Sequence, residues 1–67
     1  MIFKRGDLIV EKRFYGSLGI VLKVKKASFT KELLDIYWIK HSECGDNLRE
    51  VGIKYSLFEK ATRKNVQ

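Results

Sequence analysis

The stretch FYGSLGIVLKV, residues 14–24, decides the fold class, because an alternating apolar pattern follows directly on two glycines. Alternation with a period of two residues is typical of a β-strand that buries one of its faces. We therefore expect a strand over residues 20–26. Its buried face is expected to hold Ile20, Leu22 and Val24, and its opposite face Val21, Lys23 and Lys25.

The glycines of this stretch, Gly16 and Gly19, admit two explanations. Glycine-rich loops cradle phosphates where a helix N-terminus follows and supplies aligned N–H groups. Here a strand follows, and the Lys-Ser/Thr pair of a P-loop is absent. We therefore reject a phosphate loop and expect the first turn of the sheet at residues 16–19, where glycine tolerates positive φ.

Three further runs alternate in the same way and predict strands at Asp7–Lys12, Leu33–Ile39 and Glu50–Tyr55. A flat sheet of so few short strands leaves both its edges and one of its faces exposed, whereas curling into a small barrel covers them. The chain is thus predicted to be all-β. The predicted core consists of Leu8, Val10, Ile20, Leu22, Val24, Leu34, Ile36, Trp38, Val51, Ile53 and Leu57.

The segments between and after these runs do not alternate. Residues 27–35, ASFTKELLD, are too short for an independent helix and are expected to form a long loop with at most one turn. Near the end, Ser56 and Glu59 have the spacing of a capping box and predict a short helical turn. From Thr62 onward the chain is polar and is expected to be a flexible basic tail.

The composition indicates which kind of partner the chain binds and in which compartment it resides. The 67 residues carry a net charge of +6, which either favours a polyanionic partner or only maintains solubility. The single cysteine, Cys44, excludes an intrachain disulfide and fits a reducing cytoplasm. No run approaches the apolar length of a transmembrane helix. We expect a cytoplasmic protein that does not associate with membranes.

Four segments together resemble the SH3-like small barrel: FKRGDLIV, GSLGIVLKV, LLDIYWI and EVGIKYSLFEKA. The second segment is similar to the KOW motif of ribosomal proteins and transcription elongation factors, although Ser17 and Leu18 stand where that motif has a basic residue. The whole chain also resembles small uncharacterised proteins of tailed bacteriophages. The resemblance implies an SH3-like barrel of about five strands over residues 1–61, followed by the tail at 62–67. The acidic loops of proline-binding SH3 domains are absent, which disfavours recognition of proline-rich peptides.

Cations interspersed with aromatic rings predict a nucleic-acid-binding surface, because cations meet phosphates while rings stack on unpaired bases. The alternative is that the lysines form a solvated outer face and that Phe14 or Tyr15 covers the end of the barrel. In that case we expect Tyr15 to be the exposed ring. The candidate residues are Lys4, Arg5, Arg13, Phe14, Tyr15, Lys23, Lys25, Lys26, Tyr37, Lys40 and Lys54.

The segment HSECGD, residues 41–46, invites a metal or catalytic interpretation. Zinc sites draw on separated pairs of ligands, and this chain has no second cysteine or histidine. We expect no metal, no cofactor, no small-molecule substrate and no enzymatic activity.

The sequence predicts a module that contacts RNA or single-stranded DNA in the translation or transcription machinery. The alternative is a phage-encoded protein–protein interaction module that modulates a host protein.

Overall fold

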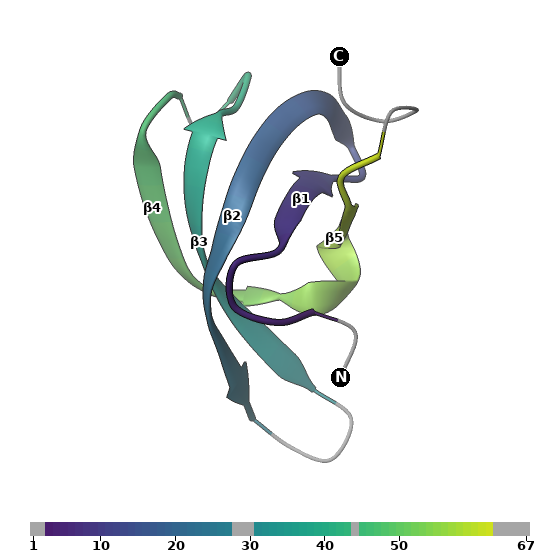
Figure 1. Ribbon diagram of the computed structural model, residues 1–67, viewed down its shortest axis with the longest axis vertical. Coiled ribbons are helices and arrows are strands. Elements are labelled where there is room, and N and C mark those ends of the chain that lie inside the picture. The colour runs from purple at the N-terminus through teal and green to yellow at the C-terminus, as the bar shows by residue number, and fades with distance from the viewer. Residues whose placement is uncertain (1–2, 28–30, 44, 63–67) are drawn as a thin grey trace.

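The computed structural model describes residues 3–27, 31–43 and 45–62, except for the side chain of Tyr15. The elements in this part of the chain are strands β1 (Leu8–Glu11), β2 (Phe14–Lys26), β3 (Glu32–Lys40), β4 (Leu48–Lys54) and β5 (Phe58–Lys60), with a 3₁₀ turn, η1 (Tyr55–Leu57). The strands form one antiparallel sheet in the order β4-β3-β2-β1-β5 (Figure 1). The predicted all-β class, with five strands and a short C-terminal helical turn, is confirmed.

The long strand β2 gives the sheet its curvature. Its first part pairs with β1, and its residues from Leu18 to Lys26 pair with β3. Figure 1 shows β2 bending over so that β3 and β4 lie on one side of it and β1 and β5 on the other. After β4, η1 carries the chain across to β5, which pairs with β1. The curled sheet thereby encloses one small core.

The core surrounds Trp38, whose side chain is fully buried. Its predicted companions on β3, Leu34 and Ile36, are also fully buried, so the predicted inner face of this strand is confirmed. Val24, Ile53 and Leu57 are partly buried and pack against this cluster. Four core members were not predicted: Phe3, Ile9, Val21 and Phe58.

The predicted inner face of β2 is wrong over its central part because of a β-bulge. Val21 pairs with Ile36 and Lys23 pairs with Asp35, so Leu22 has no partner on β3. An extra residue of this kind shifts the alternation by one position. Val21 is therefore buried, and Leu22, expected in the core, is 36% exposed. Ile20 is half-buried on the outer face, whereas Val24, beyond the bulge, faces inward as predicted.

A second bulge corrects the prediction for β4. Leu34 pairs with Ile53 and Ile36 with Glu50, which leaves Val51 and Gly52 opposite the single residue Asp35. Gly52 has a φ of 74°, a conformation that glycine adopts without strain. Val51, expected in the core, is 54% exposed.

On β1 the burial pattern differs from simple alternation as well. Ile9 and Val10 are both fully buried, so this strand is covered on both faces. Leu8, which the alternation placed in the core, is 48% exposed. The pairing of β1 with β2 shifts register between Ile9 and Glu11, and an irregularity of this kind interrupts the two-residue alternation.

The first turn lies at Lys12 and Arg13, between β1 and β2, and not at the two glycines. Gly16 and Gly19 both lie inside β2. Gly16 has a φ of 105°, as a glycine at an irregular strand position can. Gly19 has a different role, because a Cβ atom there would lie 2.7 Å from Cε3 of Trp38. It permits close approach of the indole to the β2 backbone.

The structure also corrects two local predictions, the capping box at Ser56 and the loop expected over residues 27–35. Ser56 lies inside η1, whose N-cap is Lys54 and lacks a side-chain capping hydrogen bond, so the capping box does not form. β3 begins at Glu32, within the segment expected to be a loop. Residues 63–67 of the expected tail lie outside the described part. Among the described residues, no helix is long and apolar enough to cross a membrane.

Candidate nucleic-acid interface

The outer face of strands β2, β3 and β4 is defined by the residues that pair with one another across the sheet. Gly19 and Trp38 are paired and face the core, so their sequence neighbours Ile20 and Tyr37 face outward. Directly opposite residues of antiparallel strands share a face. The pairings therefore align one outward row across four strands, consisting of Leu8, Ile20, Tyr37 and Arg49.

The same register places four cations on this outer face. Lys25 on β2 and Lys54 on β4 both pair with Leu33 of β3, and Lys23 pairs with Asp35. Arg49 pairs with Tyr37. We call this set the basic face: Lys23, Lys25, Arg49 and Lys54.

Asp35 lies within the basic face but is almost fully enclosed, with 4% of its side chain exposed. Its Oδ2 atom lies 3.2 Å from the Lys25 ammonium, and its Oδ1 atom accepts a hydrogen bond of 3.0 Å from Gly52 N–H. Burial raises the pKa of Asp35, but the Gly52 hydrogen bond, Lys25 and Arg49 outweigh it, and the net pKa is lowered. Asp35 therefore holds the β4 bulge and neutralises Lys25, while Lys23, Arg49 and Lys54 face solvent.

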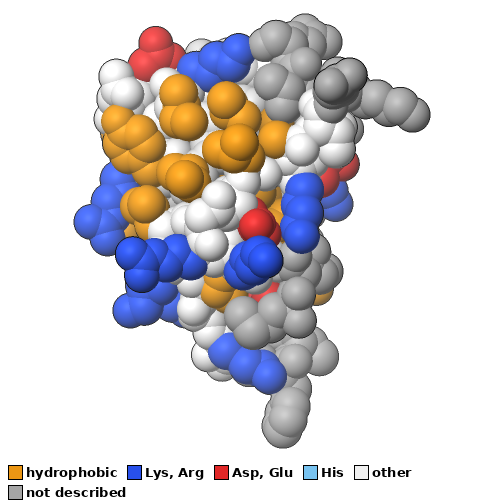
Figure 2. Space-filling model, viewed as in Figure 1, with side chains coloured by type: hydrophobic (Ala, Val, Ile, Leu, Met, Phe, Trp, Pro, Cys, Tyr) orange, Lys and Arg blue, Asp and Glu red, His pale blue; other side chains and the backbone are white. Residues whose placement is uncertain are grey.

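Apolar side chains share the outer face with these cations. Ile39 and Val51 are 42% and 54% exposed, and Leu22 is 36% exposed. Figure 2 shows hydrophobic side chains gathered over β2, β3 and β4, with Lys and Arg side chains bordering them. Tyr37, which the register places on the same outer face, is half-buried, and its hydroxyl donates a hydrogen bond of 2.8 Å to Asn47 Oδ1. The tyrosine is thereby held in place with part of its ring accessible.

The candidate residues of the first turn lie apart from the basic face. Arg13 binds Glu11 Oε2 at 3.0 Å, and its guanidinium lies 5.5 Å from the centre of the Phe14 ring. Phe14 packs against the ring of His41 at 5.1 Å between centroids and is half-buried. This ring therefore covers the interior at the end of the sheet, as the alternative prediction allowed. The side chain of Tyr15 lies outside the described residues.

The remaining candidates are distributed over three places. Lys4 and Arg5 are exposed in the segment before β1, where Lys4 N–H donates to Asp7 Oδ2. Lys26 lies at the end of β2, opposite Glu32. Lys40 lies at the end of β3, opposite Leu18. The structure thus brings Lys23, Lys25, Tyr37 and Lys54 together and leaves the other candidates elsewhere.

Arg49 is the member of the basic face that sequence reasoning missed. The residue precedes the predicted fourth strand, which was expected to begin at Glu50, and so had no assigned face. In the structure β4 begins at Leu48, and Arg49 pairs with Tyr37. Only the register between β3 and β4, which depends on the Gly52 bulge, reveals this contact.

A second polar cluster lies in the interior, around His41 and Glu11. Glu43 N–H donates to His41 Nδ1 at 3.1 Å, so the ring proton is at Nε2, which donates to Glu11 Oε1 at 3.1 Å. Glu11 N–H in turn donates to the buried Ser17 Oγ. The His41 ring also makes an edge contact with Trp38 at 4.7 Å between centroids. This network ties β1, β2 and the end of β3 together, and Ser17 Oγ is engaged as an acceptor.

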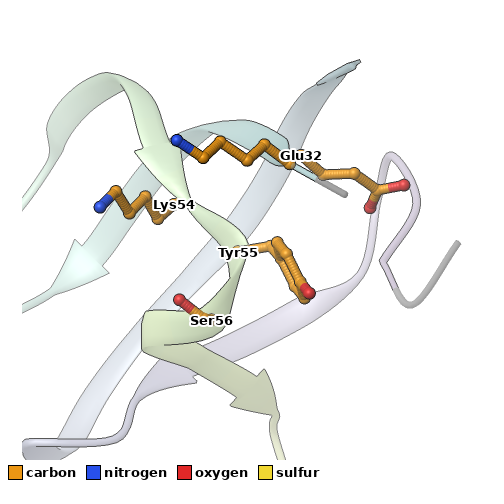
Figure 3. A pocket seen from close by; sticks show the side chains of 5 residues that line it. Glu32, Lys54, Tyr55 and Ser56 are labelled. Atoms are coloured by element: carbon orange, nitrogen blue, oxygen red, sulfur yellow. The ribbon is translucent and has the colours of Figure 1, made fainter. Parts of the chain in front are cut away.

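Beside the basic face lies a hollow of about 210 Å³, lined by Lys31, Glu32, Lys54, Tyr55 and Ser56 (Figure 3). Lys54 belongs to both features, so the hollow adjoins the basic face. A second hollow, of about 350 Å³, shares Tyr55 and Ser56 with the first. Its other lining residues are Phe3, Lys12, Phe58, Glu59 and Lys60.

Comparison with known proteins adds no assignment, since no family model, curated protein or solved structure matches the chain. Within residues 3–27, 31–43 and 45–62, no group of three or more His, Cys, Asp or Glu side chains is placed to hold a metal ion. Cys44 lies outside these ranges. The candidate functional site therefore consists of the basic face, the apolar residues beside it and the adjoining hollow.

Proposed function

We propose that this chain is a non-enzymatic module that binds RNA or single-stranded DNA across the outer face of β2, β3 and β4. The observation that carries the proposal is the basic face, where the register aligns Lys23, Arg49 and Lys54 on one surface. The acidic residue among them, Asp35, is enclosed and bonded to Lys25 and Gly52. The surface therefore offers positive charge to a phosphate backbone.

A single strand suits this surface better than a duplex. Sheet faces bind single strands by stacking unpaired bases on exposed rings and apolar side chains while cations follow the backbone. Tyr37 supplies a ring held by Asn47, and Arg49 lies directly across from it. Ile39 and Val51 supply apolar surface that phosphates alone would not use. The resemblance of GSLGIVLKV to the KOW motif supports a place in the translation or transcription machinery.

The test compares two variants that lose the same number of charges. The face variant carries Lys23→Gln, Arg49→Gln and Lys54→Gln, and the charge-matched control carries Lys4→Gln, Lys12→Gln and Arg13→Gln. Binding of fluorescent RNA and DNA single strands and of the matching duplex is measured by polarisation at low salt. We expect the face variant to lose single-strand affinity and the control to retain it. Absence of binding by the unmodified chain contradicts the proposal.

The apolar part of the same face favours a second candidate function, a protein–protein interaction module. Leu8, Ile39 and Val51 are each more than two-fifths exposed. Exposed apolar surface with a polar border is characteristic of protein interaction sites. A pull-down from bacterial lysate, with and without nuclease, separates the two candidates. A specific protein retained after nuclease treatment and lost with Ile39→Ser and Val51→Ser supports this alternative, and loss of all partners on nuclease treatment contradicts it.

A further inference from the structure

The hollow beside the basic face is sized for one small planar group. Pockets for drug-sized ligands have volumes of roughly 300–1,000 Å³, whereas this hollow has about 210 Å³. A single ring therefore fits it better than a whole cofactor or peptide segment. Lys54 lines the hollow and also belongs to the basic face. A single-stranded nucleic acid that follows the basic face toward η1 therefore arrives at this hollow.

Tyr55 forms an aromatic wall of the hollow. The residue is half-buried and packs against the core cluster, which fixes its position. It opens η1, between β4 and β5, so its backbone is held by strands on both sides. A ring that is fixed on one side and open on the other stacks on a base without a large entropic cost.

The lining of the hollow also includes a carboxylate, that of Glu32. In the part of the chain that the structure describes, no salt bridge involves this residue. Figure 3 shows the Glu32 carboxylate and the Tyr55 hydroxyl extending toward the same side, while the Lys54 side chain points the other way. A carboxylate accepts hydrogen bonds from the exocyclic amine of cytosine, and uracil has a carbonyl at the same ring position. Lys31 and Lys54, which also line the hollow, are placed to meet the flanking phosphates.

We propose that the hollow holds one base of the bound strand, with Tyr55 stacking on the ring and Glu32 accepting the amine of a cytosine. This inference rests on the proposed function, because the strand reaches the hollow along the basic face. The hollow would make binding depend on the identity of one base, whereas the basic face contacts only phosphates.

The experiment compares cytidine and uridine homopolymers of equal length, which carry equal charge. We expect the unmodified chain to bind the cytidine run about tenfold more tightly, the ratio expected of one well-placed base contact. Glu32→Gln removes this preference and leaves the salt dependence of binding unchanged. Tyr55→Leu weakens both runs by about tenfold, since a stacking contact is lost. Tyr55→Phe keeps the ring and retains the affinity.

The outcomes separate this inference from the proposed function. Equal binding of both runs, unaffected by Glu32→Gln, overturns the base-binding hollow while the salt-dependent binding to the basic face stands. Absence of binding by either run contradicts the proposed function and this inference together. Because Tyr55 packs against the core, circular dichroism melting of each variant shows whether a loss of affinity reflects unfolding. Glu32 does not belong to the core cluster, so Glu32→Gln tests the inference independently of core packing.

Discussion

Gly19 lies directly beneath the indole of Trp38, and a Cβ atom at position 19 would be 2.7 Å from Cε3 and 2.9 Å from Cζ3. Trp38 is fully buried and its Nε1 donates a hydrogen bond of 2.6 Å to Glu50, so the indole has little freedom to move. We expect Gly19→Ala to lower the free energy of unfolding by about 1–3 kcal/mol through overpacking. Urea unfolding followed by circular dichroism measures the change.

A double-mutant cycle assigns that loss to the contact itself. Trp38→Phe removes the six-membered ring of the indole that carries Cε3 and Cζ3, so Gly19→Ala is expected to cost less in that background. Equal costs in both backgrounds would show that the strain arises elsewhere.

The β4 bulge predicts that substitutions at two positions, which simple alternation treats alike, differ in their effect on stability. Val51 is 54% exposed and Ile53 packs against the core. We expect Val51→Thr to change the free energy of unfolding by less than about 0.5 kcal/mol. Ile53→Thr places a hydroxyl against apolar side chains and is expected to cost about 1–3 kcal/mol. Similar costs at both positions, measured by chemical unfolding, would refute the bulged register.

The buried pair of His41 and Glu11 predicts a large loss of stability when one partner is removed. His41→Ala deprives Glu11 Oε1 of its 3.1 Å partner and takes away the ring that Trp38 and Phe14 contact. We expect a loss of roughly 3 kcal/mol, because removal of one partner leaves a buried charge with less compensation. Lys60→Gln is the control, since its ion pair with Asp7 lies 3.8 Å apart with 56% of the Lys60 side chain exposed, and such pairs contribute about 0–1 kcal/mol. Comparable losses for the two variants would contradict a structural role for the buried pair.

Asp35 predicts a pH dependence of stability on the acid side. Its pKa in the folded chain is lowered below the value of about 3.9 for a free aspartate. A lowered folded-state pKa contributes stability that is present above the unfolded pKa and is lost as the pH falls through the folded one. We expect thermal melting temperatures to decline below about pH 4 and Asp35→Asn to reduce that decline. An acid decline that is identical in the variant would show that other carboxylates cause it.

The sequence predicts the class of fold well and the faces of individual strands less well. The alternation in β3 identifies Leu34, Ile36 and Trp38 as core residues, because no irregularity interrupts their inward face. In β2 and β4 the bulges at Leu22 and at Val51–Gly52 shift the pattern, and a bulge depends on the partner strand. Local periodicity therefore cannot locate it.

The candidate site was only partly predictable for a related reason. Lys23 and Lys25 share a face by spacing along one strand, which the sequence shows directly. Arg49 lies on the same face as these lysines only because β4 pairs with β3 in this register. Phe14 packs against His41 and therefore does not belong to the basic face. Both facts depend on contacts between residues far apart in the sequence. The sequence shows which basic and aromatic residues are available, but only the pairing register of the strands shows which of them share a surface.

The salt dependence of single-strand binding shows whether the basic face is the surface that contacts the phosphates. Each phosphate contact contributes about 0.7 to the slope of log K against log salt concentration for a single strand. We expect the face variant, with Lys23→Gln, Arg49→Gln and Lys54→Gln, to reduce the magnitude of that slope by about 2. The charge-matched control, with Lys4→Gln, Lys12→Gln and Arg13→Gln, is expected to retain the slope of the unmodified chain. Equal reductions in the two variants would show that net charge alone governs binding and would contradict the basic face as the binding surface.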